Sequence, residues 1–145
     1  MKIYIGADHR GFALKEQLKS HLREHEVIDE GAHRFNEEDD YPDFARKVSQ
    51  NVATDKNARG IIICGSGVGV EVAGNKIKGA RAGLALNPKQ VKEATEADNI
   101  NILALAADYT EPQDAKELVD AFLTSNYTPE PRRERRLKKI EELEK

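Results

Sequence analysis

The feature that most limits how this chain folds is a short apolar run ending in a cluster of glycines. Residues 60–64 read Gly-Ile-Ile-Ile-Cys, and residues 65–69 read Gly-Ser-Gly-Val-Gly. A continuous apolar run of this length is typical of a strand that is buried on both faces, as in a parallel sheet. The glycines that follow suit a tight turn. The run therefore predicts a buried strand that turns directly into a helix.

Strand-like and helix-like segments alternate along the rest of the chain. Strands are expected at residues 2–7, 27–28, 60–64, 80–86 and 101–106, and helices at residues 12–22, 44–52, from the glycine cluster to about 78, 88–97, from 112 and from 131. This alternation implies a parallel sheet with helices on both faces and right-handed crossovers. We therefore predict an α/β fold, a Rossmann-like three-layer sandwich with a five-stranded parallel sheet.

Length and composition fit a single domain spanning residues 1–145, with 39% hydrophobic and 34% charged residues. No apolar run approaches the ~20 residues that a bilayer span needs, and the N-terminus leads straight into a strand-like segment. We therefore expect no membrane span and no secretion signal. The single cysteine excludes an internal disulfide and suits a reducing compartment, so we expect a cytoplasmic protein.

The charges are unevenly distributed, although the net charge is only −3. Residues 37–40 are all acidic, and residues 132–139 hold six arginines and lysines. A basic run of this kind is either a solvated helix face or a site for a small phosphate. It has no interleaved aromatic residues that would stack on bases, and the whole chain is acidic, so we expect no nucleic-acid partner.

Polar residues follow the first and third predicted strands. In an open parallel sheet, ligands bind beyond the carboxyl ends of the strands, so Asp8, His9 and Cys64 should converge there with the segment after the fifth strand. The glycine loop does not match a dinucleotide site, because Val70 stands where the third glycine is required. It also misses a phosphate-binding P-loop, because Asn75 stands where lysine is required.

The residues alone leave three readings open. The loop at 65–69 is either an anion cradle, to which Ser66 adds a hydroxyl, or a plain turn. Cys64 is either a small buried hydrophobe or a thiolate beside a helix start. Asp8 either caps the helix that begins near residue 11 or binds a ligand. The other three histidines read as surface residues, and no group of residues has metal-ligand spacing, so we expect no metal.

Taken in order, six motifs make the chain resemble the ribose-5-phosphate isomerase B family, which includes the galactose-6-phosphate isomerase subunits. The motifs are Asp8-His9-Arg10-Gly11-Phe12, Tyr41-Pro42-Asp43, residues 60–69, Asn75-Lys76, Gly79-Ala80-Arg81 and residues 101–105. The resemblance implies a Rossmann-like fold, no cofactor, and a homodimer or homotetramer whose active sites are shared between subunits. We expect the C-terminal helix, residues 131–145, to pack on a partner subunit.

The resemblance also implies an activity, the aldose–ketose isomerisation of a small phosphorylated sugar such as ribose 5-phosphate, in the pentose phosphate pathway. Cys64 would be the base, and the thiolate is its competent form. The loop would stabilise the enediolate, with Ser66 where the family commonly has threonine. The residues expected to contact the substrate are Asp8, His9, Gly65, Gly67, Val68, Gly69, Asp98, Asn99, and the phosphate-binding Arg132 and Arg136.

The chain departs from the family pattern just before its last strand. The family's histidine, which helps to open the sugar ring, falls on Ala97, and the asparagine that touches the substrate falls on Asp98, with Asn99 next to it. An alanine cannot transfer protons. A catalytically silent phosphosugar-binding paralogue, or one subunit of a mixed oligomer, is therefore the alternative to an active isomerase.

Overall fold

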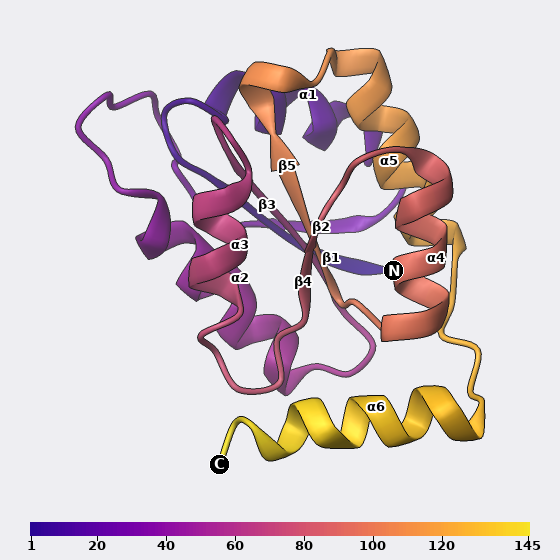
Figure 1. Cartoon of the computed structure of the whole chain (residues 1–145). Coiled ribbons are helices and arrows are strands. Elements are labelled where there is room, and N and C mark those ends of the chain that lie inside the picture. Colours follow the sequence, from indigo (N-terminus) through magenta and orange to yellow (C-terminus); the bar gives the residue numbers. More distant parts are fainter.

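The sheet has five strands, and every neighbouring pair is parallel (Figure 1). The computed structural model describes all 145 residues. The strands are β1 (Lys2–Ala7), β2 (Glu26–Asp29), β3 (Arg59–Cys64), β4 (Ala82–Leu84) and β5 (Ile102–Ala106). Their order is β2-β1-β3-β5-β4, which places β3 in the centre. The predicted parallel sheet is confirmed.

Helices cover both faces of this sheet. They are α1 (Phe12–His21), α2 (Tyr41–Thr54), α3 (Val68–Gly74), α4 (Pro88–Asp98), α5 (Pro112–Thr124) and α6 (Pro131–Glu142), with a short 3-10 helix η1 (Ala107–Tyr109). Helices α2 and α3 lie on one face, and α1, α4 and α5 lie on the other (Figure 1). These are the three layers that the sequence predicts. None of the helices combines the length and apolar character needed to cross a bilayer.

Alternate residues of β3 supply the two cores. Ile61 and Ile63 pack against α1 and α5, whereas Ile62 and Cys64 pack with side chains of α2 and α3. All four side chains are buried, as expected for a central strand of a parallel sheet. The strand therefore directs Cys64 toward the layer of α2 and α3.

Two predicted boundaries are too long. Helix α3 ends at Gly74 instead of near residue 78, and β4 has three residues instead of seven. The connection between them is a turn in which Gly79 has a positive φ of 87°. The side chain of Asn75 fixes the start of β4, because its Oδ1 accepts from the Ala82 N–H (2.8 Å) and its Nδ2 donates to the Ala82 carbonyl (2.9 Å).

Helix α6 lies across the amino ends of the strands, at the opposite edge from the loops that follow β1 and β3 (Figure 1). The Gly79 amide donates to Glu144 Oε1 (2.9 Å), and Arg133 Nη1 donates to the carbonyls of Thr128 (2.9 Å) and Glu96 (3.4 Å). A groove of about 630 Å³ separates the end of α6 from the body, and no residue of α6 is buried. The helix is thus attached by a few polar contacts.

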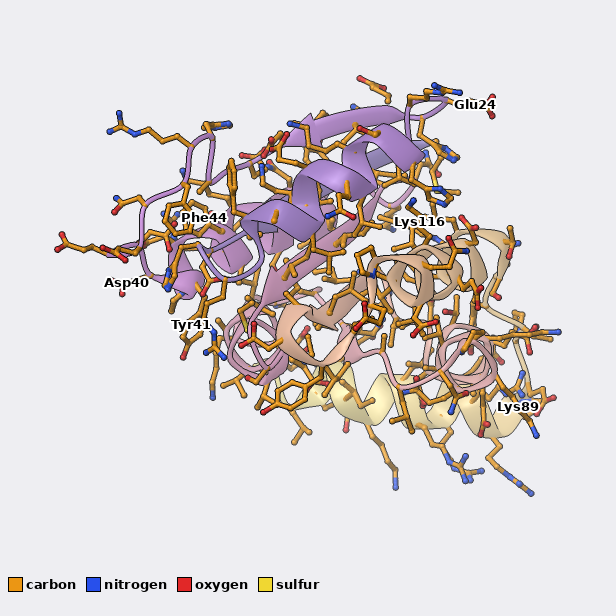
Figure 2. All side chains as sticks on the ribbon, turned by 90° about the horizontal axis from the view of Figure 1, so that it is seen from above. Glu24, Asp40, Tyr41, Phe44, Lys89 and Lys116 are labelled. Carbon is orange, nitrogen blue, oxygen red and sulfur yellow. The ribbon has the colours of Figure 1, made fainter.

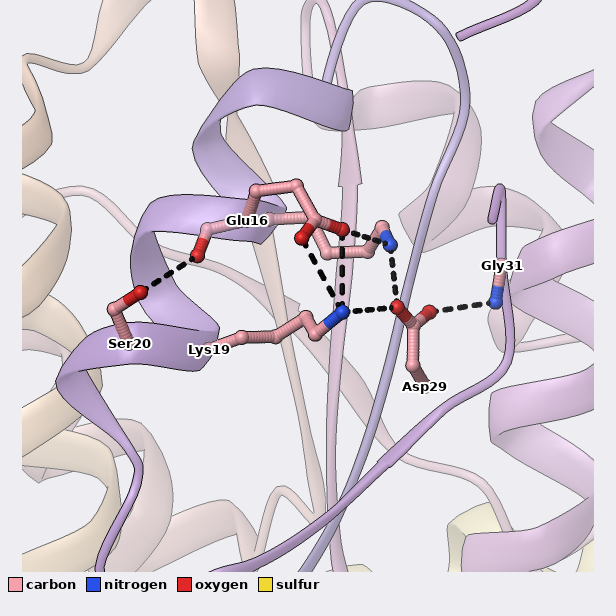
Figure 3. A network of polar contacts seen from close by, with 6 residues as sticks. Glu16, Lys19, Ser20, Asp29 and Gly31 are labelled. Atoms are coloured by element: carbon pink, nitrogen blue, oxygen red, sulfur yellow. Dashed lines mark hydrogen bonds and ion pairs between the residues drawn. The ribbon is translucent and has the colours of Figure 1, made fainter. Parts of the chain in front are cut away.

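A network of charged side chains ties α1 to β2, and Figure 3 shows Glu16, Lys19, Asp29 and the Gly31 amide within it. Lys15 is fully buried, and its Nζ donates to Asp29 Oδ2 (2.7 Å) and to Glu16 Oε1 (2.9 Å). Lys19 donates to the same Asp29 oxygen (2.7 Å), and the other Asp29 oxygen accepts from the Gly31 amide (2.8 Å). The edge strand is therefore fixed to the first helix by charge as well as by packing.

Candidate active site

The glycine loop between β3 and α3 has no room for a side chain at Gly67 or at Gly69. Gly67 has a φ of +73°, and a Cβ there would lie 2.5 Å from Leu84 Cδ1. A Cβ on Gly69 would lie 2.6 Å from the ring of Tyr41. The first amides of α3 have no partner within the helix, because the first such bond runs from the Glu71 N–H to the Gly67 carbonyl (3.2 Å). The loop can therefore offer backbone N–H groups to an anion.

Cys64 stands at the base of this loop, next to the end of β1. The Asp8 amide donates to the Ile63 carbonyl (3.3 Å), which brings Asp8 beside the cysteine. Asp8 Oδ1 accepts from the amides of Arg10 (3.0 Å) and Gly11 (3.1 Å), and burial raises the pKa of the carboxyl despite these bonds. These bonds lie within the turn of residues 8–11, whereas the N-cap of α1 is Gly11 and has no side-chain cap bond, so the helix cap that the sequence offered for Asp8 is not observed. The second carboxyl oxygen has no protein partner and is free to meet a ligand.

His9 is held by a carboxylate that sequence reasoning missed. Asp39 Oδ1 accepts from both the His9 backbone amide (2.9 Å) and His9 Nδ1 (2.8 Å). The bond to Asp39 is the main reason that the pKa of His9 is raised. The two residues are 30 positions apart, and Asp39 belongs to the acidic loop that the sequence marked only as a concentration of negative charge.

Arg10 lies above Gly65 on the other side of the strand end. A Cβ on Gly65 would lie 2.0 Å from Arg10 Cζ, so the guanidinium occupies the space that a side chain would need. Arg10 Nε donates to Asp108 Oδ2 (3.0 Å), and Nη2 donates to the same oxygen. The Asp108 amide in turn donates to the Gly65 carbonyl (3.0 Å). The segment after β5 therefore does converge on the end of β3, as predicted.

Two further polar residues near the loop are occupied by local bonds. The Ser66 side chain is exposed, and its Oγ accepts from the Val68 amide (3.3 Å). Glu71, in the first turn of α3, accepts a bond from the Leu84 amide at Oε1 (3.0 Å). Glu71 therefore joins α3 to β4.

The remaining predicted residues lie at the opposite edge of the sheet. Asp98 and Asn99 end α4, and Asn99 adopts the left-handed region (φ 51°) while its carbonyl accepts from Arg81 Nε (2.6 Å). Arg132 and Arg136 are exposed on α6 and take part in no ion pair. We call these residues the amino-edge cluster (Asp98, Asn99, Arg132, Arg136).

The structure thus divides the predicted site in two. Asp8, His9, Cys64 and residues 65–69 come together and form what we call the carboxyl-edge cluster. Within one chain, the amino-edge cluster lies at the other end of the strands, below the sheet in Figure 1. Seen from above, Tyr41 and Asp40 lie at the outer rim beside α2, far from Lys89 on α4 (Figure 2).

One group of side chains has the composition of a metal site. Asp8, His9 and Asp39 offer ligand atoms within 4.8 Å of one another. No spacing in the sequence marks this group, because Asp39 lies 30 positions from His9. Hydrogen bonds already account for the geometry, since Asp8 Oδ1 accepts two amides and Asp39 Oδ1 accepts from His9. The arrangement therefore requires no cation to explain it.

Fold and cluster together define a class: a three-layer α/β protein with a buried cysteine and a glycine-rich helix start at the carboxyl edge of its sheet. Comparison with known proteins identifies the family. The chain matches the family model described as Ribose/Galactose Isomerase over residues 3–140. It therefore belongs to that family, as its ordered motifs predicted.

Three relatives illustrate the match. Ribose-5-phosphate isomerase B of Mycolicibacterium paratuberculosis is 35% identical, with 100% of this chain and 92% of that protein covered. A ribose-5-phosphate isomerase B structure from Mycoplasma genitalium with bound ribulose-5-phosphate has a TM-score of 0.94 and 38% identity, over 99% of this chain and 95% of that one. The structure of a ribose 5-phosphate isomerase from Thermotoga maritima has a TM-score of 0.91 and 40% identity, over 97% of each chain.

Proposed function

We propose that this chain interconverts ribose 5-phosphate and ribulose 5-phosphate, with Cys64 as the base. The observation that carries the proposal is the position of Cys64, which lies between the Asp8 turn and the open amides of the glycine loop. The proposal is supported by the names of the relatives and by the ribulose-5-phosphate bound in the Mycoplasma genitalium structure.

The reaction needs a proton to move between two carbons. The thiolate of Cys64 removes the proton from C2 of the open-chain aldose, and the electron pair moves to the carbonyl oxygen to give an enediolate. Within the enediolate the proton on O2 passes to O1, and the Cys64 thiol then returns the first proton to C1, which gives the C2 ketone and the C1 hydroxyl of the ketose and restores the thiolate. The amides of Gly65, Gly67, Val68 and Gly69 stabilise the negative oxygen, for which the Val68 amide gives up its bond to Ser66 Oγ, and the Ser66 hydroxyl adds to them. Fixed dipoles aimed at developing charge lower the barrier.

Substrate binding falls to the charged residues of both clusters. Asp8 and His9 contact the sugar, while Asp98 and Asn99 approach it from the amino-edge cluster. Arg132 and Arg136 hold the phosphate, because a guanidinium meets phosphate oxygens with two parallel hydrogen bonds. The two arginines are four residues apart, so one face of α6 presents both.

The two clusters meet when two chains associate, and we infer a homodimer, or a homotetramer built from it, with shared active sites. In a twofold dimer the amino edge of one chain can face the carboxyl edge of the other. Exposed apolar side chains on α3 (Val68, Val72), on α6 (Ile140) and just after α6 (Leu143) support the inference, since the chain leaves much of their surface uncovered. Residues 131–145 would then pack on the partner subunit.

A catalytically silent phosphosugar-binding protein, or one subunit of a mixed oligomer, is the second candidate. Ala97 favours it, because the residue at this position cannot carry a proton. For either function the compartment we propose is the cytoplasm, on the strength of the single unpaired Cys64.

The activities of the wild type and of Cys64→Ala together test the proposal. The variant should keep the fold, since alanine fits the space of a small buried side chain, and should lose isomerisation together with exchange of the C2 proton into solvent. NMR of ribose 5-phosphate in deuterated water follows both. Wild-type activity that survives in the variant would show that Cys64 is not the base. A wild type that binds ribose 5-phosphate without converting it would favour the silent paralogue.

A further inference from the structure

Asp39, a loop residue, forms hydrogen bonds with both the backbone and the side chain of His9. One oxygen, Asp39 Oδ1, accepts from the backbone amide of His9 (2.9 Å) and from Nδ1 of its ring (2.8 Å). The carboxylate therefore fixes the backbone and the ring of His9 at the same time. Nδ1 donates in this bond, and Nε2, the other ring nitrogen, has no protein partner.

Burial makes this contact more than a surface ion pair. The Asp39 side chain is only 9% exposed, and its second oxygen, Oδ2, is buried without any hydrogen-bond partner. A buried carboxylate that lacks further donors is costly unless a cation faces it. His9 is the one basic side chain bonded to Asp39. The ring of Phe35 adds an edge-to-face contact with the imidazole at 6.4 Å between ring centroids.

We propose that Asp39 is a positioning residue of the active site, which holds His9 as an imidazolium with its Nε2–H directed to an anionic oxygen of the phosphorylated sugar. The proposal rests on the proposed function for the identity of the ligand. The arrangement itself rests on the two bonds to one oxygen and on the unpartnered second oxygen.

The charges around His9 determine how it responds to pH. The bond to Asp39 raises the pKa of His9 most, the nearby Asp8 adds to this, and burial and the cation of Arg10 oppose it. Below its raised pKa, His9 carries a positive charge that attracts the substrate. As pH rises through that pKa, the charge and its attraction are lost. Asp39 therefore extends the pH range over which His9 is charged.

The test compares two isosteric substitutions at adjacent acidic residues. Asp39→Asn keeps an oxygen that accepts from both His9 donors but removes the charge. Asp40→Asn makes the same change of charge on an exposed side chain at the rim of the molecule that has no bond to His9 (Figure 2). The readouts are the NMR titration of the His9 imidazole, assigned with His9→Gln, and the KM and kcat for ribose 5-phosphate from pH 6 to pH 9.

In Asp39→Asn the midpoint of the His9 titration should fall by about one pH unit, which is the size expected when a close opposite charge is removed. KM should match that of the wild type at the acidic end, where both proteins carry the imidazolium. It should rise by about tenfold between the two midpoints, while kcat changes less. Asp40→Asn should leave both readouts close to those of the wild type.

An unchanged His9 midpoint in Asp39→Asn would overturn the proposal, and so would a KM that rises by the same factor at every pH, because a merely structural loss has no reason to follow the titration. If the wild type converts no ribose 5-phosphate, the proposed function fails. The dissociation constant of inorganic phosphate, measured across the same pH range in the three proteins, then takes the place of KM and decides the role of Asp39.

Discussion

The two residues at the end of β3 face opposite layers of the molecule. Cys64 packs with the core under α2 and α3, whereas the space beyond Gly65 is filled by the guanidinium of Arg10. Asp108 holds that guanidinium and also donates its amide to the Gly65 carbonyl. The backbone that carries the proposed base is therefore fixed from the side opposite to the thiol, and a side chain at Gly65 would displace Arg10.

This chain has Ala97 where the family has the histidine that helps to open the sugar ring. A sugar already in open form needs no ring-opening group, whereas ribose 5-phosphate must open first. We expect Ala97→His to raise kcat/KM for ribose 5-phosphate more than for a four-carbon aldose phosphate. A general acid–base group is worth ~10²–10⁴-fold when well placed, so a gain of about tenfold is expected even with imperfect placement.

Progress curves for both substrates check this expectation. Native turnover of ribose 5-phosphate that already exceeds turnover of the four-carbon sugar would show that another residue opens the ring. His9, with its bond to Asp39, would be the first to replace.

Single residues differ in how far the sequence could place them. Asp8 and His9 directly follow one predicted strand and Cys64 is the last residue of another, and the geometry of parallel sheets is enough to bring them together. Asp39 lies in an irregular loop, where no periodicity relates it to His9. The contact between Asp39 and His9 could be found only once the path of the loop was known.

On helix α6, the arginines differ in what they touch. Arg133 donates to carbonyls of the body, whereas Arg132 and Arg136 are exposed and in no ion pair. We expect Arg132→Ala or Arg136→Ala to weaken binding of ribose 5-phosphate by about 10- to 100-fold, the range of a lost hydrogen bond to a charged group. Binding of unphosphorylated ribose should hardly change.

Arg135→Ala is the matched control, because Arg135 is also exposed and its substitution removes the same charge from the same helix. Calorimetric titrations of the three variants with both ligands make the comparison. If all three variants lose the same affinity for ribose 5-phosphate, the effect comes from the overall charge of α6. If a variant loses the same affinity for ribose 5-phosphate and for ribose, the arginine has a structural role and does not hold the phosphate.

The link between α1 and β2 predicts a response to acid. Burial alone would raise the pKa of Asp29, but the bonds from Lys15, Lys19 and the Gly31 amide outweigh it and lower the pKa below the usual 3.8. Since the folded value lies below the unfolded one, the stabilisation is fully present above about pH 4 and is lost as pH falls through the folded pKa. Unfolding by urea between pH 7 and pH 3 measures it.

Asp29→Asn should lower the free energy of unfolding at pH 7 by about 3 kcal/mol, because it leaves the buried Lys15 without its main partner. It should also flatten the loss of stability below pH 4. Lys15→Met is expected to cost less, since Asp29 keeps Lys19 and the Gly31 amide. A larger cost for Lys15→Met would contradict this account of the buried pair.

The end of the central strand β3 could be predicted from the sequence, whereas the start of the outermost strand β4 could not. The apolar run of β3 can form only a central strand, and it has the predicted end at Cys64. Strand β4 is shorter than its apolar pattern suggested, because Asn75 and the turn at Gly79 determine where it starts. A side-chain bond of this kind leaves no periodic signal in the sequence.

Considered as a whole, the molecule has its predicted site residues at both ends of its strands. The carboxyl-edge cluster holds the proposed base, and the amino-edge cluster holds the proposed phosphate ligands. A sheet keeps its two edges apart by the length of its strands, so no rearrangement of loops joins the clusters within one chain. Their union requires a second copy, and this consequence is testable without knowing the interface.

Two impaired variants should restore activity when mixed, if the sites are shared. Cys64→Ala lacks the base but keeps both arginines, and Arg136→Ala lacks a phosphate ligand but keeps the cysteine. In a mixed dimer, one site combines both defects, and the other combines the intact Cys64 of one chain with the intact Arg136 of its partner. Random exchange of subunits makes half of the dimers mixed, so about a quarter of wild-type activity should return. The mixture is unfolded and refolded together and assayed at substrate concentrations well below KM, with each variant alone as control. A site contained within a single chain would give no activity above the sum of the two controls, and that result would contradict the shared site.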